Sequence, residues 1–206
     1  MGQSAVASAR PSALDLRRAR RLTIPDVLSP GLRVLFCGIN PGLYSGAVGH
    51  HFARPGNRFW KALHMSGFTP RRLSPFEDAT LPRFGLGITN LCPRTTARAD
   101  ELGARELVRG AAALAEKAAV WRPCVVAVLG IGAYRLAFGR PGAVLGLQEA
   151  DIGGCAAWVL PNPSGLNAHY SLPELARRFR ALRRAADGSM PTGRVRHSER
   201  GLVGPR

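Results

Sequence analysis

The chain has 206 residues, and its 29 Lys and Arg against 13 Asp and Glu give a formal net charge of +16. This length fits one ordinary α/β domain that can bury a real core. No stretch reaches the length of a membrane span, and the N-terminus lacks the apolar core of a signal peptide. We therefore expect neither a membrane-spanning nor a secreted protein.

The basic residues are almost all Arg, since only Lys61 and Lys117 are lysine. Arg suits bidentate contact with phosphate, so the charge predicts an anionic partner, most simply nucleic acid. A compositional bias toward Arg, combined with solvated basic ends, would explain part of the same charge.

The cysteines lie far apart and form no C-x-x-C pair, at Cys37, Cys92, Cys124 and Cys155. This spacing indicates neither a zinc site nor an iron–sulfur site. Three of them lie in apolar runs and are expected to be buried thiols, which is typical of a reducing, intracellular setting.

Residues 1–22 are rich in Ala, Ser and Arg and are predicted to be a basic flexible arm with one possible helical turn at Leu14–Arg21. The run Arg33–Gly38 is apolar without polar alternation, as in a strand buried on both faces. Pro41-Gly42 then forces a sharp turn, which puts Asn40 at the carboxyl end of a central parallel strand. Ligands bind at such ends in open α/β sheets. A turn-capping role would explain Asn40 equally well, because Asn-Pro is a common turn dipeptide.

The following segments are predicted in chain order. Residues 41–55 form a long Gly-rich binding loop, and Asn57 caps a helix that extends to Gly67. A Pro-rich connection, Thr69–Pro82, follows. Further strands are expected at Leu86–Leu91, Val125–Leu129 and Ala156–Leu160. Helices are expected from Asp100 to about Trp121, at Ala133–Phe138 and at Leu172–Ala186. Residues 187–206 are predicted to be a disordered basic tail, which leaves residues 23–186 as the folded domain.

Strands that alternate with helices predict right-handed crossovers and a parallel sheet. Two sharp turns, at Asn40-Pro41-Gly42 and at Pro161-Asn162-Pro163-Ser164-Gly165, would then lie on the same rim. A third turn, Gly130-Ile131-Gly132, lacks the further Gly and the downstream acid of a dinucleotide site. The reading as a doubly wound nucleotide-binding enzyme is weakened accordingly.

Three sequence blocks carry a resemblance to a known family: Gly38-Ile39-Asn40-Pro41-Gly42, the stretch from Gly49-His50-His51-Phe52 to Asn57-Arg58-Phe59-Trp60-Lys61, and Pro161-Asn162-Pro163-Ser164-Gly165-Leu166. In this order and at these distances, they resemble the mismatch-specific uracil/thymine DNA glycosylases of the uracil-DNA glycosylase superfamily. The segments Gly87–Leu91 and Arg94–Thr96 are similar too, and the likeness covers Leu32 to Ala186. It implies an α/β three-layer sandwich, with a central four-stranded parallel sheet flanked by helices.

The resemblance has a mixed character. The His50-His51 block is similar to the thymine-DNA glycosylase branch, and the stretch from Asn162 to Leu166 to the bacterial mismatch-specific branch. After Leu166 the chain departs from the family with Asn167-Ala168-His169-Tyr170, which affects the contacts that the loop would make with phosphates and the opposite base.

The resemblance also implies a role for individual residues. Asn40 would be catalytic by positioning water. The base pocket would comprise Ile39, Ser45, His51, Phe52, Asn57 and Asn90. Leu166 would be the wedge that fills the gap left by a flipped nucleotide, with DNA contacts from Ser164, Gly165 and Asn167. Purely structural alternatives stay open: Phe52 as a core aromatic, Asn90 as a turn cap, and Leu166 as one exposed leucine on a loop.

The predicted function is a monofunctional DNA glycosylase that removes uracil, preferably opposite guanine, from double-stranded DNA. It would use no metal and no organic cofactor, and it would act as a monomer in the bacterial cytoplasm at the nucleoid. Two alternatives remain: a glycosylase acting mainly on thymine or other altered pyrimidines opposite guanine, and a non-catalytic Arg-rich DNA-binding protein.

Overall fold

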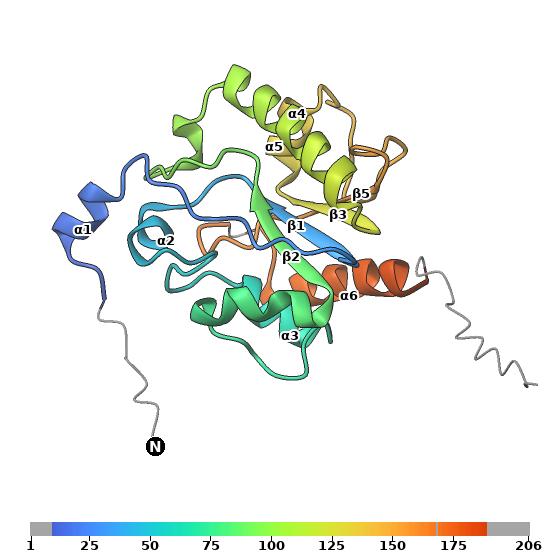
Figure 1. Cartoon of the computed structure of the whole chain (residues 1–206), viewed down its shortest axis with the longest axis horizontal. Coiled ribbons are helices and arrows are strands. Elements are labelled where there is room, and N and C mark those ends of the chain that lie inside the picture. The colour runs from blue at the N-terminus through green and yellow to red at the C-terminus, as the bar shows by residue number, and fades with distance from the viewer. Residues whose placement is uncertain (1–9, 168, 189–206) are drawn as a thin grey trace, which may run out of the picture.

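The computed structural model describes residues 10–167 and 169–188. They form three layers, in which one twisted sheet has helices on both faces (Figure 1). The sheet has the strand order β2-β1-β3-β5-β4. Its strands are β1 (Val34–Gly38), β2 (Leu86–Asn90), β3 (Val125–Leu129), β4 (Gly146–Leu147) and β5 (Ala156–Leu160).

The four predicted strands form the parallel part of this sheet, in agreement with the expected fold class. The fifth strand, β4, was not predicted and pairs antiparallel with β5. It has only two residues and is not buried, so it carries neither a hydrophobic run nor an alternation that a sequence pattern could show.

One face of the sheet is covered by α3 (Phe59–Met65) and α6 (Leu172–Gly188). Phe36 of the central strand packs there between aromatic rings, with ring centroids 5.3 Å from Phe59 and 5.7 Å from Phe179. All three side chains are fully buried, so they anchor both helices to the middle of the sheet.

The other face is covered by α4 (Ala104–Trp121), which follows the short 3₁₀ helix η2 (Ala99–Glu101), and by α5 (Ile131–Ala137). Leu35 points to this side because successive side chains of a strand alternate, and it shares a buried cluster with Leu114 and Tyr134. The two hydrophobic clusters on either side of the sheet make up the core of the predicted sandwich.

Two further helices lie in segments that were predicted to be irregular. They are α2 (Leu43–Val48), inside the expected binding loop, and the 3₁₀ helix η1 (Pro75–Phe84), in and beyond the Pro-rich connection. Ser74 and Glu77 form a capping box at the start of η1 and explain why a helical segment forms there despite its prolines.

Within residues 10–22 of the expected arm, a helix forms where the sequence predicts a helical turn. Helix α1 (Ala13–Arg18) begins with a capping box between Ser12 and Asp15, and it packs near α2. Ala19 is buried, and its carbonyl accepts a hydrogen bond from the Thr95 hydroxyl. Residues 1–9 of the expected arm and residues 189–206 of the expected tail lie outside the described residues, and α6 itself continues to Gly188.

Cys37, Cys92 and Cys155 are buried, and each of these three is a free thiol. Burial raises the pKa of the Cys92 thiol to about 11. Within residues 10–167 and 169–188, no three His, Cys, Asp or Glu side chains cluster in a way that could hold a metal ion, and no helix is long and apolar enough to cross a membrane.

Candidate active site

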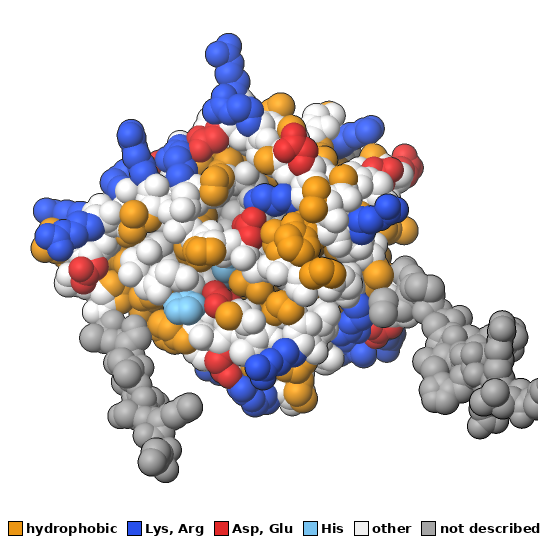
Figure 2. Space-filling model, viewed as in Figure 1, with side chains coloured by type: hydrophobic (Ala, Val, Ile, Leu, Met, Phe, Trp, Pro, Cys, Tyr) orange, Lys and Arg blue, Asp and Glu red, His pale blue; other side chains and the backbone are white. Residues whose placement is uncertain are grey.

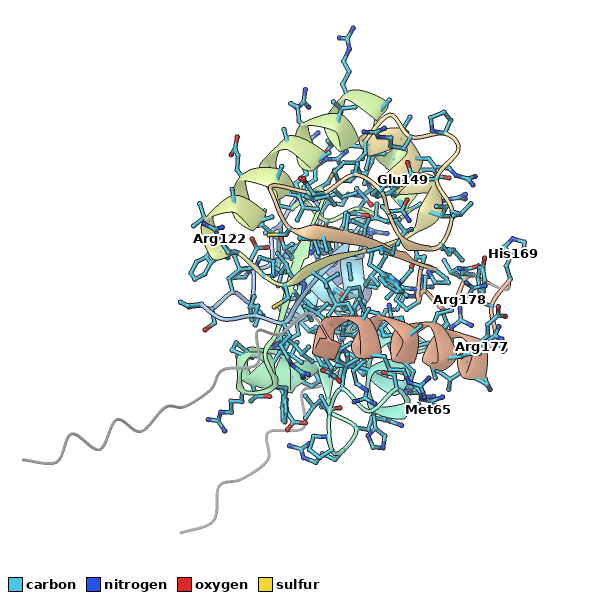
Figure 3. All side chains as sticks on the ribbon, turned by 90° about the vertical axis from the view of Figure 1, so that its right-hand side faces the viewer. Met65, Arg122, Glu149, His169, Arg177 and Arg178 are labelled. Atoms are coloured by element: carbon cyan, nitrogen blue, oxygen red, sulfur yellow. The ribbon has the colours of Figure 1, made fainter. Side chains whose placement is uncertain are left out.

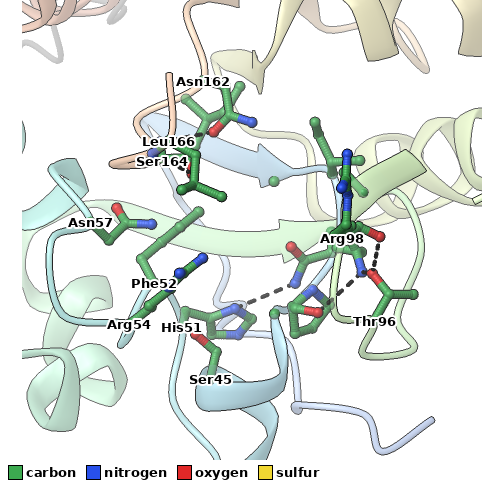
Figure 4. Close-up of a pocket in the computed structure, with 18 of the residues that line it drawn as sticks. Ser45, His51, Phe52, Arg54, Asn57, Thr96, Arg98, Asn162, Ser164 and Leu166 are labelled. Atoms are coloured by element: carbon green, nitrogen blue, oxygen red, sulfur yellow. Dashed lines mark hydrogen bonds between the residues drawn. The ribbon is translucent and has the colours of Figure 1, made fainter. Parts of the chain in front are cut away.

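The register of the sheet gathers polar residues at one rim. Gly38 pairs with Asn90, and Leu129 pairs with Leu160, so these strands end at the same level. A pocket of about 660 Å³ opens there (Figure 4). Every predicted site residue except Gly165 lines it, namely Ile39, Asn40, Ser45, His51, Phe52, Asn57, Asn90, Ser164, Leu166 and Asn167.

The amide of Asn40 is fixed by the protein. Its Nδ2 donates to the Thr96 hydroxyl at 2.7 Å, and it lies 3.1 Å and 3.2 Å from the carbonyl oxygens of Pro41 and Arg94. The Thr96 hydroxyl in turn donates to the Arg98 carbonyl at 2.7 Å. An amide has two N–H donors and one acceptor oxygen. Since protein groups take up the donors, Oδ1 is the part of the amide that Asn40 offers to the pocket.

A histidine sets the orientation of the second amide, Asn90. His51 Nε2 lies 3.0 Å from the Pro25 carbonyl, which can only accept, so Nε2 carries the hydrogen. Burial lowers the pKa of His51 and favours the neutral ring. Its Nδ1 is then the acceptor for Asn90 Nδ2 at 3.4 Å. Asn90 Oδ1 is left as an acceptor, and it lies over Gly38, where an added Cβ would come within 2.5 Å of it.

Phe52 forms an aromatic platform in the pocket. Its ring stacks on Phe59, with centroids 4.2 Å apart and planes at 24°. Its backbone has a φ of 52°, in the left-handed region that bulky residues rarely adopt. The next residue, Ala53, donates its N–H to the Ser45 hydroxyl at 3.0 Å, which holds the strained turn in place.

Residues 162–167 and 169–170, here called the wedge loop, place Leu166 over the pocket, and Leu166 is 74% exposed. Inside the loop, Asn167 Nδ2 donates to the Asn162 carbonyl at 2.9 Å and Ser164 N donates to Asn162 Oδ1 at 3.0 Å. The backbone of Gly165 lies close to the Gly56 carbonyl. The predicted N-cap, Asn57, accepts from the backbone N–H of the first α3 residue at 2.9 Å, although Arg58 holds the N-cap position.

Sequence reasoning missed several residues of the site. Arg54, Thr96, Arg98 and Asn162 line the pocket, and no role was predicted for any of them. Figure 4 shows Arg54 and Arg98 on opposite sides of the cavity. The Arg98 guanidinium is paired with Asp100 at 2.7 Å, whereas Arg54 is exposed and turned toward the platform. The sequence offers only a weak signal for Arg54, a cation inside a Gly- and Pro-rich loop.

A second hollow of about 700 Å³ lies behind the wedge loop and shares Ile39, Asn162 and Asn167 with the first. Arg178 lines it, with its guanidinium carbon 5.4 Å from the centre of the Tyr170 ring. In Figure 3, His169 and Arg178 lie near each other beside the start of α6. Figure 2 shows the face of the molecule that is seen in Figure 1. On this face, Lys and Arg side chains lie mainly around the outline, with hydrophobic and neutral side chains toward the centre.

Comparison with known proteins identifies the fold and the family. The solution NMR structure of a candidate uracil DNA glycosylase from Methanosarcina acetivorans matches with a TM-score of 0.54, over 79% of this chain and 98% of that one. At 20% sequence identity, this likeness concerns the fold. The family model of the uracil DNA glycosylase superfamily matches residues 25–185. Because that match spans the sheet, the pocket and the wedge loop, the chain belongs to the uracil DNA glycosylase superfamily.

Proposed function

We propose that this protein is a monofunctional DNA glycosylase that hydrolyses the N-glycosidic bond of uracil in double-stranded DNA, preferably where uracil is mispaired with guanine. Within its superfamily, we assign it to the mismatch-specific uracil/thymine branch. Its partner is a DNA duplex with a damaged or mismatched base, in keeping with the net charge of +16.

The observation that carries the proposal is the fixed amide of Asn40 at the rim of the pocket. An amide does not ionise near neutral pH, so it cannot act as a general base. It can hold a water molecule through Oδ1, in line with the sugar carbon of a bound nucleotide. The reaction then depends on departure of the base as an anion, while DNA phosphates and pocket dipoles stabilise the separated charge.

The second amide supplies selection of the base. Because Asn90 Nδ2 donates a hydrogen bond to His51, the acceptor Oδ1 of Asn90 faces the pocket. Uracil carries an N3–H donor and can bond to such an acceptor, whereas cytosine presents an N3 lone pair that repels it. A buried polar group left unpaired costs free energy, so this arrangement discriminates against the normal base.

A base inside the stack is out of reach of Asn40, so the nucleotide must rotate out of the duplex. Phe52 offers the flipped base a stacking surface, which contributes about 1–3 kcal/mol. Leu166, at the exposed tip of the wedge loop, fills the gap that the nucleotide leaves. Arg54 lines the same pocket, and its charge stabilises the departing anion.

The test is incubation of the protein with a U·G duplex, followed by alkaline cleavage at abasic sites. We expect strand scission with wild type and none above background with Asn40→Ala. Parallel substrates carrying U·A, T·G, etheno-cytosine opposite guanine and single-stranded uracil decide between uracil and other altered pyrimidines. Binding to all duplexes without any abasic product would instead identify a non-catalytic DNA-binding protein.

The same reactions also test the monofunctional mechanism. Lys61 and Lys117 lie on α3 and α4 and do not line the pocket, so no Schiff base with the sugar is expected. Borohydride should therefore trap no covalent adduct. A trapped adduct would reject the monofunctional mechanism while leaving the glycosylase assignment intact.

A further inference from the structure

We propose that Arg58 is a positioning residue that ties the base pocket to the wedge loop, so that Leu166 is held ready to enter the duplex before DNA binds. This inference rests on the glycosylase function proposed above. It assigns to one arginine the coupling between the two parts of the site.

Arg58 bonds to the wedge loop at four points. Its backbone N–H donates to the Pro163 carbonyl at 3.0 Å. Its guanidinium Nη2 donates to the carbonyls of Ser164 at 2.8 Å and Asn167 at 2.7 Å, and Nη1 donates to the carbonyl of Tyr170. The planar guanidinium presents its donors in a rigid fork, which fixes the relative positions of these three carbonyls. The loop is therefore shaped around one side chain from a distant part of the sequence.

On its other side, Arg58 adjoins the pocket through its two sequence neighbours. It holds the N-cap position of α3, between Asn57, which lines the pocket, and Phe59, on which the Phe52 platform stacks. Asn57 Oδ1 accepts the N–H of Phe59 and keeps this turn closed. This turn therefore supports the base platform through Phe59 and holds the wedge loop through Arg58.

A second contact independently joins the two loops. The backbone of Gly165, next to the wedge residue, lies so close to the Gly56 carbonyl that an added Cβ would come within 2.6 Å of this oxygen. A carbonyl oxygen cannot rotate out of the way like the end of a flexible side chain. The wedge loop therefore packs against Gly56 in a defined position. Arg58, which follows closely in the sequence, bonds to the same loop.

This arrangement matters for duplex substrates in particular. An exposed leucine on a loop tip has few contacts of its own, and ordering such a loop costs conformational entropy. If the folded protein already holds the loop in place, DNA binding does not have to supply the entropy of ordering it. Single-stranded uracil needs no extrusion and no wedge. Loss of Arg58 should consequently slow excision from duplexes far more than excision from single strands.

The experiment measures single-turnover uracil excision at saturating enzyme on U·G, U·A and single-stranded substrates of one sequence. We expect Arg58→Gln to reduce the duplex rates about tenfold or more, the scale of one lost charge-assisted hydrogen bond. The single-strand rate should change less than about threefold. The double variant Arg58→Gln/Leu166→Ala should be no slower on duplexes than Leu166→Ala alone, since both act through the same wedge.

Arg183→Gln is the matched control. Arg183 is another half-buried arginine that donates to a backbone carbonyl, that of Ser66 at 3.0 Å, but it does so away from the pocket. Its loss should lower stability without changing the ratio of duplex to single-strand rates. If Arg58→Gln does not fold, Gly165→Ala tests the same coupling, because it displaces the loop from Gly56 and should give the same ratio change.

Three outcomes are decisive. Equal losses on single-stranded and duplex substrates, or multiplicative losses in the double variant, would overturn the positioning role. If Arg183→Gln changes the ratio of duplex to single-strand rates as much as Arg58→Gln does, the effect of Arg58 would be one of general stability and the positioning role would be rejected. If the wild type forms no abasic product on any uracil substrate, the proposed function itself fails, and this result is distinguishable from both.

Discussion

The side-chain amide of Asn40 and the hydroxyl of Thr96 are 2.7 Å apart, although the two residues leave different strands and are separated by 56 positions. The Thr96 hydroxyl can accept from Asn40 because its own hydrogen is directed to the Arg98 carbonyl. This chain of two hydrogen bonds determines which end of the Asn40 amide faces the pocket. Each member of it can be tested.

Asn40→Ala should abolish most of the chemistry. We expect single-turnover excision of uracil to fall by about 10²-fold or more, the scale of one preorganised polar group. DNA affinity should stay close to wild type, since Oδ1 is proposed to hold water and not DNA. The thermal midpoint should fall modestly, because the hydrogen bonds of Nδ2 are lost. Excision at the wild-type rate would mean that Asn40 is only a turn cap.

Thr96→Val keeps the shape of the side chain and removes the hydroxyl. The Asn40 amide then loses its shortest partner and gains freedom to rotate, so excision should slow by about tenfold, as for loss of one strong hydrogen bond. Thr95→Val is the control, because the neighbouring hydroxyl bonds to the Ala19 carbonyl away from the pocket. Thr95→Val should lower the melting temperature and leave the rate unchanged. The reverse pattern would contradict this role for Thr96.

Leu166→Ala tests the wedge. The truncated side chain no longer fills the gap in the stack, and this should slow excision more for a stable U·A pair than for a U·G mismatch. Stopped-assay time courses on U·A, U·G and single-stranded substrates measure the difference. The same loss on all three, or none, would rule out a wedge role.

His51 should make both stability and excision sensitive to mild acid. Burial lowers its pKa below the ordinary value of 6.5, so the unfolded chain binds the proton first as the pH falls. The His51 contribution to the free energy of unfolding is therefore complete above pH 6.5 and is lost as the pH falls through the lowered pKa. A protonated ring would also turn Nδ1 into a donor and displace the Asn90 amide, which slows uracil excision.

Denaturant unfolding and single-turnover rates between pH 5 and 8 check this prediction. The variant His51→Gln has no titrating ring and should show a flatter profile in both measurements. An unchanged acid limb in this variant would assign the pH dependence to another group.

The C-terminal residues 189–206 include Arg194, Arg196, Arg200 and Arg206, and their predicted role is electrostatic. Each phosphate contact contributes about −0.9 to the slope of the logarithm of the binding constant against the logarithm of salt concentration. Truncation after Gly188 should flatten this slope and leave excision at saturating enzyme nearly unchanged. A slope equal to that of the full chain would show that these arginines do not contact DNA.

The sequence was informative where apolar residues follow one another without interruption. Val125–Leu129 and Ala156–Leu160 were predicted with the observed bounds because both are runs of apolar residues with no competing pattern. The segment of α2 was predicted to be a loop, because it contains Gly46 and is flanked by Gly42 and Gly49, and glycines are typical of turns. The conformation of such short segments depends on the parts of the protein that pack against them.

The candidate site also contains residues that the sequence predicts and residues whose role depends on the fold. Residues on the rim, such as Asn40, could be predicted, since the ends of parallel strands must meet. Thr96 and Arg58 could not, because their importance depends on partners that the fold brings from distant positions. A threonine or an arginine carries the same signature in a sequence whether it orients an amide, holds a loop or faces water.

The left-handed backbone of Phe52 has a cost that the protein bears at all times. A non-glycine residue in that region is less stable by about 1–2 kcal/mol than in an ordinary conformation. In return, the ring is held against Phe59 in a defined orientation. The protein thus gives up part of its folding stability to keep this aromatic surface in place. If Phe52 stacks on the base as proposed, a substitution that relaxes the turn should give a more stable protein that excises uracil more slowly.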